Sequence, residues 1–202
     1  MPKAHNKASE WFDGLYKENK ESQENIPWAK QTVNPLLQTY LDKKEEHKGK
    51  ALVIGCGLGD DARALGLAGY DVTAIDVSQT ALDLAKERFS DSTIIFEKQD
   101  ILDMPQKYHE HFDFVFEAFT VQSLLVEFRE QMVKAVVDTV SVGGKLLLVA
   151  HKREEAFEGP PWPLSDEDVA IFKKTGLTEL SHTLHTEESK ISNSRFRVLY
   201  RK

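Results

Sequence analysis

The chain of 202 residues has little cysteine, no long apolar segment and no excess of positive charge. Its single cysteine, Cys56, excludes a disulfide within the chain and fits a reducing, cytoplasmic compartment. No apolar run approaches the length of a membrane span, and residues 1–5 lack the apolar core of a signal peptide. We therefore expect one soluble domain over residues 1–202, long enough to bury a core without metals or disulfides.

The formal net charge is −7, and lysine and arginine are dispersed along the chain. A protein that holds nucleic acid by its phosphates needs clustered positive charge, so we expect a small-molecule substrate and no nucleic-acid partner. His109 and His111 flank Glu110 in a polar connector, but no cysteine or third ligand lies nearby in the sequence. This cluster is interpreted as a solvated loop, and no metal is expected. The expected assembly is a monomer or a weak homodimer.

The most informative segment joins an apolar run at residues 51–54 to three glycines at alternate positions, Gly55, Gly57 and Gly59. The apolar run predicts a buried parallel strand, and the glycines predict a sharp turn in which the backbone passes close to a ligand. Two acids follow, beginning with Asp60, and a helix is expected to start there. This pattern indicates a loop that holds a nucleotide.

The spacing of the glycines bears on which nucleotide the loop holds. A dinucleotide fingerprint, G-x-G-x-x-G, has its third glycine where this chain has Asp60. The carboxylates of Asp60 and Asp61 would repel a pyrophosphate and already complement the positive end of the helix dipole. A cationic ligand without phosphates, such as S-adenosylmethionine, fits better. A nicotinamide-dependent oxidoreductase remains an alternative, as does a glycine-rich turn in some other α/β protein.

A second acidic position strengthens the nucleotide interpretation. Asp76 ends the β-rich segment at residues 70–76 and lies nineteen positions after Gly57. Acids at this spacing hold the ribose hydroxyls in nucleotide-binding βαβ units, because a carboxylate accepts hydrogen bonds from both hydroxyls of the diol. The alternative is a surface aspartate at a strand end.

Strand-like and helix-like segments alternate along most of the chain. Strands are expected at about residues 50–55, 70–76, 93–97, 112–117, 145–150, 177–186 and 194–201. Helices are expected at about residues 9–21, 30–45, 60–68, 79–89, 124–141 and 165–174. The alternation predicts an α/β fold with a doubly wound, mostly parallel seven-stranded sheet and helices on both faces. The short link between the last two strands predicts a C-terminal antiparallel hairpin.

Four further motifs accompany the glycine loop. They are Trp11-Phe12 with Ile26-Pro27-Trp28, the segment 76–81 after the second strand, the segment 112–122 around the fourth strand, and the Gly-Pro-Pro-aromatic loop at residues 159–165. The glycine loop resembles motif I of class I S-adenosylmethionine-dependent methyltransferases. All the motifs together resemble the group of thiopurine, halide and thiol methyltransferases, which includes tellurite-resistance methyltransferases. The resemblance covers nearly the whole chain and implies the Rossmann-like methyltransferase fold with S-adenosyl-L-methionine as cofactor.

The resemblance also implies a cofactor site, with residues 1–30 as a segment that covers the cofactor. The expected cofactor-binding residues are Trp11, Trp28, Gly55, Cys56, Gly57, Gly59, Asp76, Val77, Asp100, Ile101, Glu117 and Ala118. Aromatic faces attract a sulfonium cation, although Trp11 equally fits simple packing on a helix. Asp100 has the alternative role of a helix cap, and Glu117 that of a structural partner for a helix end.

The expected reaction is methyl transfer to a small acceptor such as a thiol, a halide or another soft nucleophile. Phe119 and Trp162 are expected to contact the acceptor, with Trp162 presented as an apolar wall by its proline-rich loop. A soft anion binds ionised and needs no general base, so no catalytic residue is assigned. If the acceptor is instead the oxygen or nitrogen of a small metabolite, His151 and Glu117 are the candidate bases. A non-catalytic module that binds S-adenosylmethionine is a further alternative.

Overall fold

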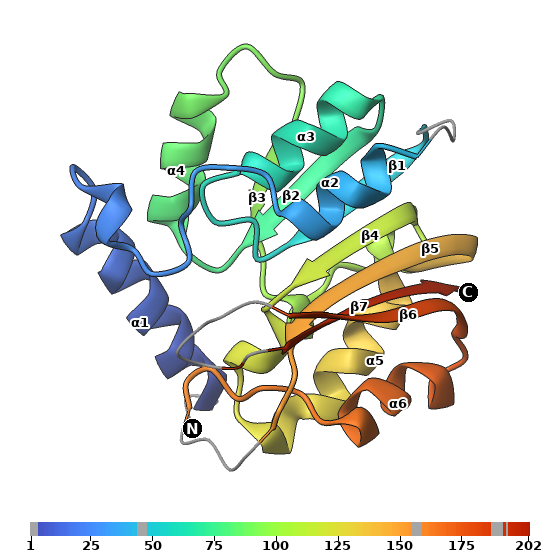
Figure 1. Cartoon of the computed structure of the whole chain (residues 1–202). Coiled ribbons are helices and arrows are strands. Elements are labelled where there is room, and N and C mark those ends of the chain that lie inside the picture. The colour runs from blue at the N-terminus through green and yellow to red at the C-terminus, as the bar shows by residue number, and fades with distance from the viewer. Residues whose placement is uncertain (1–3, 44–47, 155–158, 187–191, 193) are drawn as a thin grey trace. The chain divides into compact units, whose positions relative to one another are not determined.

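The structure, a computed structural model, describes residues 4–43, 48–154, 159–186, 192 and 194–202 (Figure 1). The chain divides into two compact units, Met1–Asp100 and Ile101–Lys202. Strands and helices alternate in each unit, which confirms the α/β class expected from the sequence.

The first unit is built on three parallel strands in the order β3-β2-β1. Its elements are α1 (Ala4–Glu18), the 3-10 turn η1 (Gln23–Asn25), α2 (Pro35–Leu41), β1 (Lys50–Ile54), α3 (Asp60–Ala68), β2 (Asp71–Asp76), α4 (Gln79–Arg88) and β3 (Ile95–Lys98). Parallel strands end at the same edge of a sheet. The loop after β1 and the residues after β2 are therefore neighbours.

The second unit contains four strands in the order β4-β5-β7-β6. Strands β4 and β5 are parallel, whereas β7 is antiparallel to both β5 and β6. The pairing of β6 with β7 confirms the predicted C-terminal hairpin. The elements are the 3-10 turns η2 (Ile101–Asp103) and η3 (Gln106–Tyr108), β4 (Phe112–Ala118), η4 (Val121–Ser123), η5 (Val126–Phe128), α5 (Arg129–Thr139), β5 (Val140–His151), α6 (Asp166–Lys174), β6 (Thr178–Thr186) and β7 (Ser194–Arg201).

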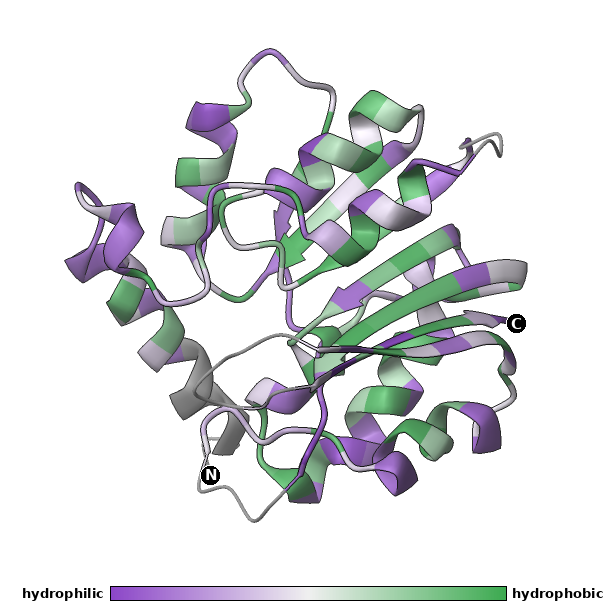
Figure 2. Ribbon diagram, viewed as in Figure 1, coloured by the Kyte–Doolittle hydropathy of each residue, from purple (hydrophilic) through white to green (hydrophobic). Residues whose placement is uncertain are grey.

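Strand burial explains why each unit holds together. Apolar residues follow the strands of both units in Figure 2. In the first unit Leu52 of β1 is fully buried, and in the second unit Leu147 of β5 is fully buried. The continuous apolar runs of β1 and β5 are typical of strands covered on both faces.

The helix expected at residues 30–45 is much shorter than predicted, because α2 covers only Pro35–Leu41. The side chain of Asn34 caps it and accepts a hydrogen bond from the amide of Leu36 at 2.9 Å. Pro35 fits the first turn of a helix, but a residue before proline is biased toward extended backbone. The Asn-Pro pair therefore starts the helix at Pro35, and the residues of the expected helix that precede Asn34 are not helical.

The helix expected at residues 124–141 is also shorter, because two 3-10 turns precede α5 and the helix ends at Thr139. The strand expected at 145–150 begins earlier, since β5 starts at Val140. Gly143, expected just beyond the helix, has a φ of 82° within β5, and the pairing of β5 with β4 shifts register in this region. Its glycines therefore belong to an irregular part of the strand and not to a loop.

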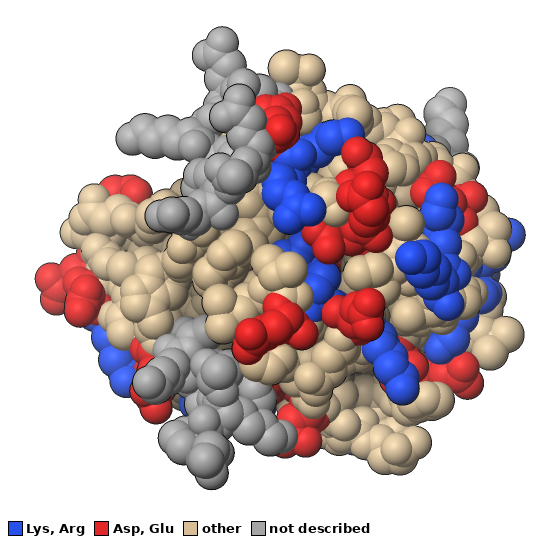
Figure 3. All heavy atoms as spheres, turned by 90° about the horizontal axis from the view of Figure 1, so that it is seen from below, with Lys and Arg blue, Asp and Glu red and all other residues tan. Residues whose placement is uncertain are grey.

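Among the described residues, no helix combines the length and the apolar character that a membrane span requires. On the face drawn in Figure 3, lysine and arginine side chains lie beside aspartate and glutamate side chains. This mixture agrees with the dispersed charge of the sequence.

Candidate functional site

The loop between β1 and α3 is a turn that depends on glycine. Gly55, Gly57 and Gly59 have φ values of 63°, 50° and 85°, in a region that residues with a Cβ rarely adopt. The amide of Gly59 donates to the carbonyl of Cys56 at 2.9 Å and closes the turn. Helix α3 then begins at Asp60, as predicted. The glycines thus place bare backbone at the edge where the strands end.

Asp76, the last residue of β2, fixes this turn. Its Oδ2 accepts a hydrogen bond from the amide of Gly57 at 2.9 Å, and its Oδ1 accepts one from the amide of Ser78 at 2.9 Å. Burial raises the pKa of Asp76, and these backbone hydrogen bonds oppose part of the rise. A carboxylate oxygen can accept a second hydrogen bond. The carboxylate therefore keeps acceptor positions that suit the two hydroxyls of a ribose.

Cys56 lies inside the same turn and is buried. Burial raises the pKa of its thiol, and the nearby carboxylate of Asp76 raises it further. The side chain is thus a neutral thiol at ordinary pH, which fits a backbone role for Cys56 and gives no support to a reactive one.

The two acids that open α3 have separate partners. Asp60 forms a two-pronged ion pair with Arg88, with oxygen–nitrogen distances of 2.8 Å for both prongs. Asp61 Oδ1 accepts a hydrogen bond from the amide of Asn34 at 2.7 Å, and burial raises the pKa of Asp61 to about 6. Both carboxylates thus stand at the N-terminus of α3 and occupy the positive end of the helix dipole, the position that a phosphate would otherwise take.

The rings of Trp11, Tyr16 and Trp28 form an aromatic cluster in the N-terminal segment, and Tyr16 of this cluster contacts the glycine turn. A Cβ placed on Gly57 would lie 2.8 Å from the hydroxyl oxygen of Tyr16, so this hydroxyl rests against the turn. The indole N–H of Trp28 donates to the same hydroxyl at 2.8 Å. Trp28 is 40% exposed, and the rings of Trp11 and Trp28 are 6.0 Å apart. The structure therefore brings Trp28 close to the turn, and Trp11 packs beside Trp28.

Tyr16 was not predicted from the sequence, nor was Asp13, which anchors the same helix. Asp13 Oδ1 accepts hydrogen bonds from the hydroxyl of Ser78 at 2.8 Å and from the amide of Thr80 at 3.1 Å. Partial burial raises the pKa of Asp13, but its hydrogen bonds, including one from Lys17, outweigh this and hold the pKa well below its usual range. The sequence signal that could have indicated Asp13 is its place among the aromatic residues of this helix.

Val77, Asp100 and Ile101 follow strands β2 and β3. Val77 is half-buried beside Asp76, and the amide of Gln99 donates to the carbonyl of Asp76 at 3.0 Å. This bond brings the residue before Asp100 to the end of β2. Ile101 is buried and starts η2. The short 3-10 turn η2 thus follows Asp100 directly. This position fits the alternative role of Asp100 as a helix cap.

Glu117 and Ala118 end β4 in the second unit. Oε1 of Glu117 accepts hydrogen bonds from the amides of Thr120 at 2.7 Å and Val121 at 2.8 Å, which begin η4. Its Oε2 has no hydrogen-bond partner among the described residues. Burial raises the pKa of Glu117 to about 7, although the backbone hydrogen bonds and the charge of Arg129 lower it. The structural role predicted as the alternative for Glu117 is therefore present.

Phe119 and His151 lie together in the second unit. Phe119 has a φ of 64°, a conformation that costs a bulky residue on the order of 1–3 kcal/mol and marks a constrained position. Its ring lies 5.0 Å from the imidazole ring of His151, and the guanidinium of Arg195 lies 5.2 Å from the Phe119 ring. His151 is only 6% exposed. The geometry supports packing by His151 more directly than proton transfer.

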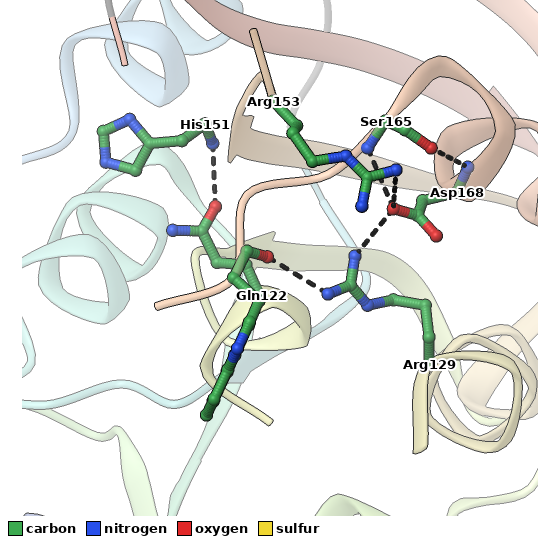
Figure 4. Close-up of polar contacts among 7 residues, drawn as sticks. Gln122, Arg129, His151, Arg153, Ser165 and Asp168 are labelled. Atoms are coloured by element: carbon green, nitrogen blue, oxygen red, sulfur yellow. Dashed lines mark hydrogen bonds and ion pairs between the residues drawn. The ribbon is translucent and has the colours of Figure 1, made fainter. Parts of the chain in front are cut away.

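Trp162 is connected to this group through its backbone. Its amide donates to the carbonyl of Gln122 at 2.7 Å, and the side chain of Gln122 accepts a hydrogen bond from the amide of His151 at 2.8 Å (Figure 4). The guanidinium of Arg129 donates to the carbonyl of Trp162 at 3.1 Å. Gln122 and Arg129 were not predicted, because the sequence gives no sign of which distant backbone groups they contact.

The sequence of this chain is similar to those of known methyltransferases. The sequence model described as Thiopurine S-methyltransferase matches residues 16–197. Thiocyanate methyltransferase 1 of Brassica oleracea is 26% identical over 199 residues, which cover 94% of this chain and 83% of that protein. Thiopurine S-methyltransferase of Legionella pneumophila (strain Corby) is 25% identical over 184 residues, which cover 82% of this chain and 80% of that protein.

Solved structures give the fold independently. The N-methyltransferase NodS from Bradyrhizobium japonicum WM9, in complex with S-adenosyl-L-homocysteine, is similar with a TM-score of 0.75 at 20% sequence identity. The match covers 94% of this chain and 99% of that one. This likeness confirms the predicted Rossmann-like methyltransferase fold.

The buried carboxyl of Glu117 predicts a specific pH dependence of stability. Folding raises the pKa of Glu117 from 4.5 to about 7, so the folded chain binds this proton more tightly than the unfolded chain. Its contribution to the free energy of unfolding is therefore complete below pH 4.5 and is lost as the pH rises toward 7. We expect Glu117→Gln to reduce this loss by about 1–3 kcal/mol, because glutamine keeps a carbonyl acceptor for Thr120 and Val121.

Urea unfolding of the wild type and the variant across this pH range measures the difference. Glu130→Gln, which changes an exposed glutamate of α5, is the matched control and should follow the wild type. Parallel stability curves for the wild type and Glu117→Gln would contradict the assignment.

Proposed function

Because the chain belongs to the thiopurine S-methyltransferase family, we propose that it transfers a methyl group from S-adenosylmethionine to a small thiol or a similar soft nucleophile, such as thiocyanate or a halide. Membership of this family makes the chain an S-adenosylmethionine-dependent methyltransferase. The acceptor class is supported by relatives named for thiocyanate and thiopurine methylation. The observation that carries the proposal is the direct contact of Asp76 with the glycine turn.

The family does not favour the other functions considered from the sequence. A nicotinamide-dependent oxidoreductase would need a helix N-terminus that accepts a pyrophosphate, and α3 begins instead with Asp60 and Asp61. A module without catalysis, and an O- or N-methyltransferase, are likewise less well supported than methyl transfer to sulfur or another soft atom.

The residues of the first unit suit the cofactor. We assign the backbone of the turn to the methionine part, the carboxylate of Asp76 to the ribose, and Val77 to the adenine ring. The proposed cofactor-binding residues are those expected from the sequence, Trp11, Trp28, Gly55, Cys56, Gly57, Gly59, Asp76, Val77, Asp100, Ile101, Glu117 and Ala118, with Tyr16 added because its hydroxyl rests against the turn. An acceptor-rich carboxylate and bare backbone fit the diol and the zwitterionic tail of this molecule.

The bound cofactor supplies a methyl group attached to a sulfonium. When this methyl group is transferred, the neutral thioether S-adenosylhomocysteine leaves without needing a proton. The protein then has to hold the reactants in line and exclude water. We assign the exclusion of water to residues 1–30 and treat residues 1–202 as one methyltransferase domain. Within the N-terminal segment, the bond between Trp28 and Tyr16 and the anchoring of Asp13 to Ser78 hold the aromatic cluster beside the turn.

Phe119 and Trp162 are the proposed acceptor contacts. Apolar faces suit a soft, weakly hydrated acceptor, because little hydration is lost when it leaves water. The reaction of such an anion needs no general base. The described contacts of Glu117 and His151 support a reaction without a general base, since Glu117 holds the backbone of η4 and His151 packs against Phe119. We therefore assign no catalytic residue and propose catalysis by proximity and alignment.

The setting of the enzyme is also proposed. A single buried cysteine fits a reducing, cytoplasmic environment. Dispersed charge supports a small-molecule substrate without a nucleic-acid or membrane partner, and we retain a monomer or weak homodimer as the expected assembly.

The proposed reaction predicts which acceptors are methylated and how the rate depends on pH. With S-adenosylmethionine present, S-adenosylhomocysteine should form with a small thiol, thiocyanate, iodide or a thiopurine, and much more slowly with a catechol or a primary amine. The rate with a thiol should rise with pH toward the thiol pKa of about 8.5, whereas the rate with thiocyanate, which is already ionised, should change little. Chromatography of S-adenosylhomocysteine measures both. Preferential methylation of the catechol or amine, or parallel pH profiles for thiol and thiocyanate, would contradict the proposal.

The assignment of Asp76 predicts a loss of cofactor affinity in Asp76→Asn. The amide keeps one acceptor but loses the charge, and a hydrogen bond to a charged group contributes about 1.5–3 kcal/mol. Calorimetry should show an S-adenosylhomocysteine affinity reduced roughly 10- to 100-fold. Asp71→Asn, which changes an exposed residue at the other end of β2, is the matched control. A folded Asp76→Asn variant with wild-type affinity would remove Asp76 from the cofactor site.

A further inference from the structure

Arg129, the first residue of α5, is a buried charge in the second unit. Its side chain is only 2% exposed, so its guanidinium needs internal partners to offset the loss of water. Nη1 lies 3.1 Å from Oδ2 of Asp168, and Nη2 donates to the carbonyl of Trp162 at 3.1 Å. Figure 4 shows the guanidinium pointing toward Asp168. One planar group therefore joins an acid on α6 to the backbone of the proline-rich loop.

Asp168 is itself fixed by the start of α6. Its Oδ2 accepts a hydrogen bond from the amide of Ser165 at 2.9 Å, and its own amide donates to the hydroxyl of Ser165 at 3.1 Å. These two bonds form a capping box. The carboxylate that Arg129 contacts is thus already oriented, so the ion pair transmits the position of α6 to the loop. Arg153 lies further from the same carboxylate, at 4.0 Å, and is 41% exposed.

The loop is held at Leu164 by backbone hydrogen bonds with His151 and Arg153, and before that point it is held at Trp162. Pro160, Pro161 and Pro163 lack an N–H group, so Trp162 is the one residue of this run that can donate from its backbone. That N–H is bonded to the carbonyl of Gln122, and the carbonyl of Trp162 is bonded to Arg129. Both backbone polar groups of Trp162 are therefore fixed, one by η4 and one by α5.

We propose that Arg129 is a positioning residue for the methyl acceptor: it holds the Trp162 backbone so that the half-buried indole forms a fixed wall. The inference rests on the proposed function, in which Trp162 contacts the acceptor. Arginine suits this task because its planar fork directs N–H groups at two acceptors in fixed directions, whereas lysine presents a single ammonium on a flexible stem. A wall fixed before binding also spares the complex the entropy cost of ordering the loop.

The test compares Arg129→Lys and Arg129→Met with two control variants. Arg129→Lys keeps a positive charge beside Asp168 and so tests the loop contact even if Arg129→Met fails to fold. Ser165→Ala removes the hydroxyl of the capping box but leaves the contact between Arg129 and Trp162, and it should lower the stability of α6 alone. Arg153→Ala removes the weaker, exposed neighbour of the same carboxylate.

The expected result is a change confined to the acceptor. For each Arg129 variant, KM for the acceptor should rise roughly tenfold, because the acceptor must then order the Trp162 wall when it binds. The affinity for S-adenosylhomocysteine should stay within about twofold of the wild type, since the assigned ribose contact is made by Asp76. Both controls should keep KM near the wild-type value.

Two further readouts separate positioning from a general loss of stability. Between residues 160 and 165 the exchangeable amides belong to Trp162, Leu164 and Ser165, and all three are hydrogen-bonded. Hydrogen exchange of this segment should accelerate in Arg129→Lys at a temperature where the rest of the chain stays protected. In a double-mutant cycle, Arg129→Lys should raise KM no further in a Trp162→Ala background, which keeps the carbonyl but lacks the indole.

Additive effects in that cycle, unchanged KM in Arg129→Lys, or an equal rise of KM in Ser165→Ala at matched stability would overturn the proposal. Failure of the proposed function has a different signature. In that case the wild type itself would form no S-adenosylhomocysteine from any soft nucleophile, and the positioning role would fall with it.

Discussion

The hydrogen bond that the Asp76 carboxylate accepts from the amide of Gly57 in the glycine turn is the constraint on which the first unit depends. The left-handed turn after β1 is stable only with glycine, and the amide of Gly57 is satisfied by the Asp76 carboxylate. The same carboxylate binds the amide of Ser78, whose hydroxyl in turn contacts Asp13 of α1. One buried acid thus connects the turn, the start of α4 and the N-terminal aromatic cluster. A residue with this many structural contacts keeps its remaining acceptors in a fixed place, which a ligand needs.

In the second unit, too, buried polar side chains hold the backbone of turns and loops, but here they lie behind apolar side chains. Buried polar side chains are costly unless their hydrogen bonds are made, and here those bonds go to the backbone of short turns. Glu117 holds the first amides of η4, Gln122 links this turn to the end of β5, and Arg129 fixes the loop that carries Trp162. Apolar faces at Phe119 and Trp162 are then held by polar groups behind them. Rigid apolar walls fit a reaction that needs alignment more than proton transfer.

Local sequence signals predicted the parts of the structure that depend on nearby residues. The glycine turn and Asp76 followed from the spacing of a βαβ unit, and the hairpin followed from a short polar link. The helix expected at 30–45 was wrong because the Asn34-Pro35 pair, and not the hydrophobic periodicity, sets where α2 begins. Tyr16 and Arg129 escaped prediction for another reason. Their importance comes from contacts with backbone groups far along the chain, and no periodicity or spacing encodes such contacts.

The turn held by Asp76 is the proposed cofactor site of this methyltransferase. A crystal structure of the chain with S-adenosylhomocysteine tests this most directly. We expect the ribose hydroxyls to lie within hydrogen-bond distance of the Asp76 carboxylate. The amino-acid part of the ligand should follow the backbone of Gly55 and Gly57, and Trp28 should cover the ligand. A ligand bound away from the glycine turn, or a ribose that Asp76 does not contact, would contradict this assignment.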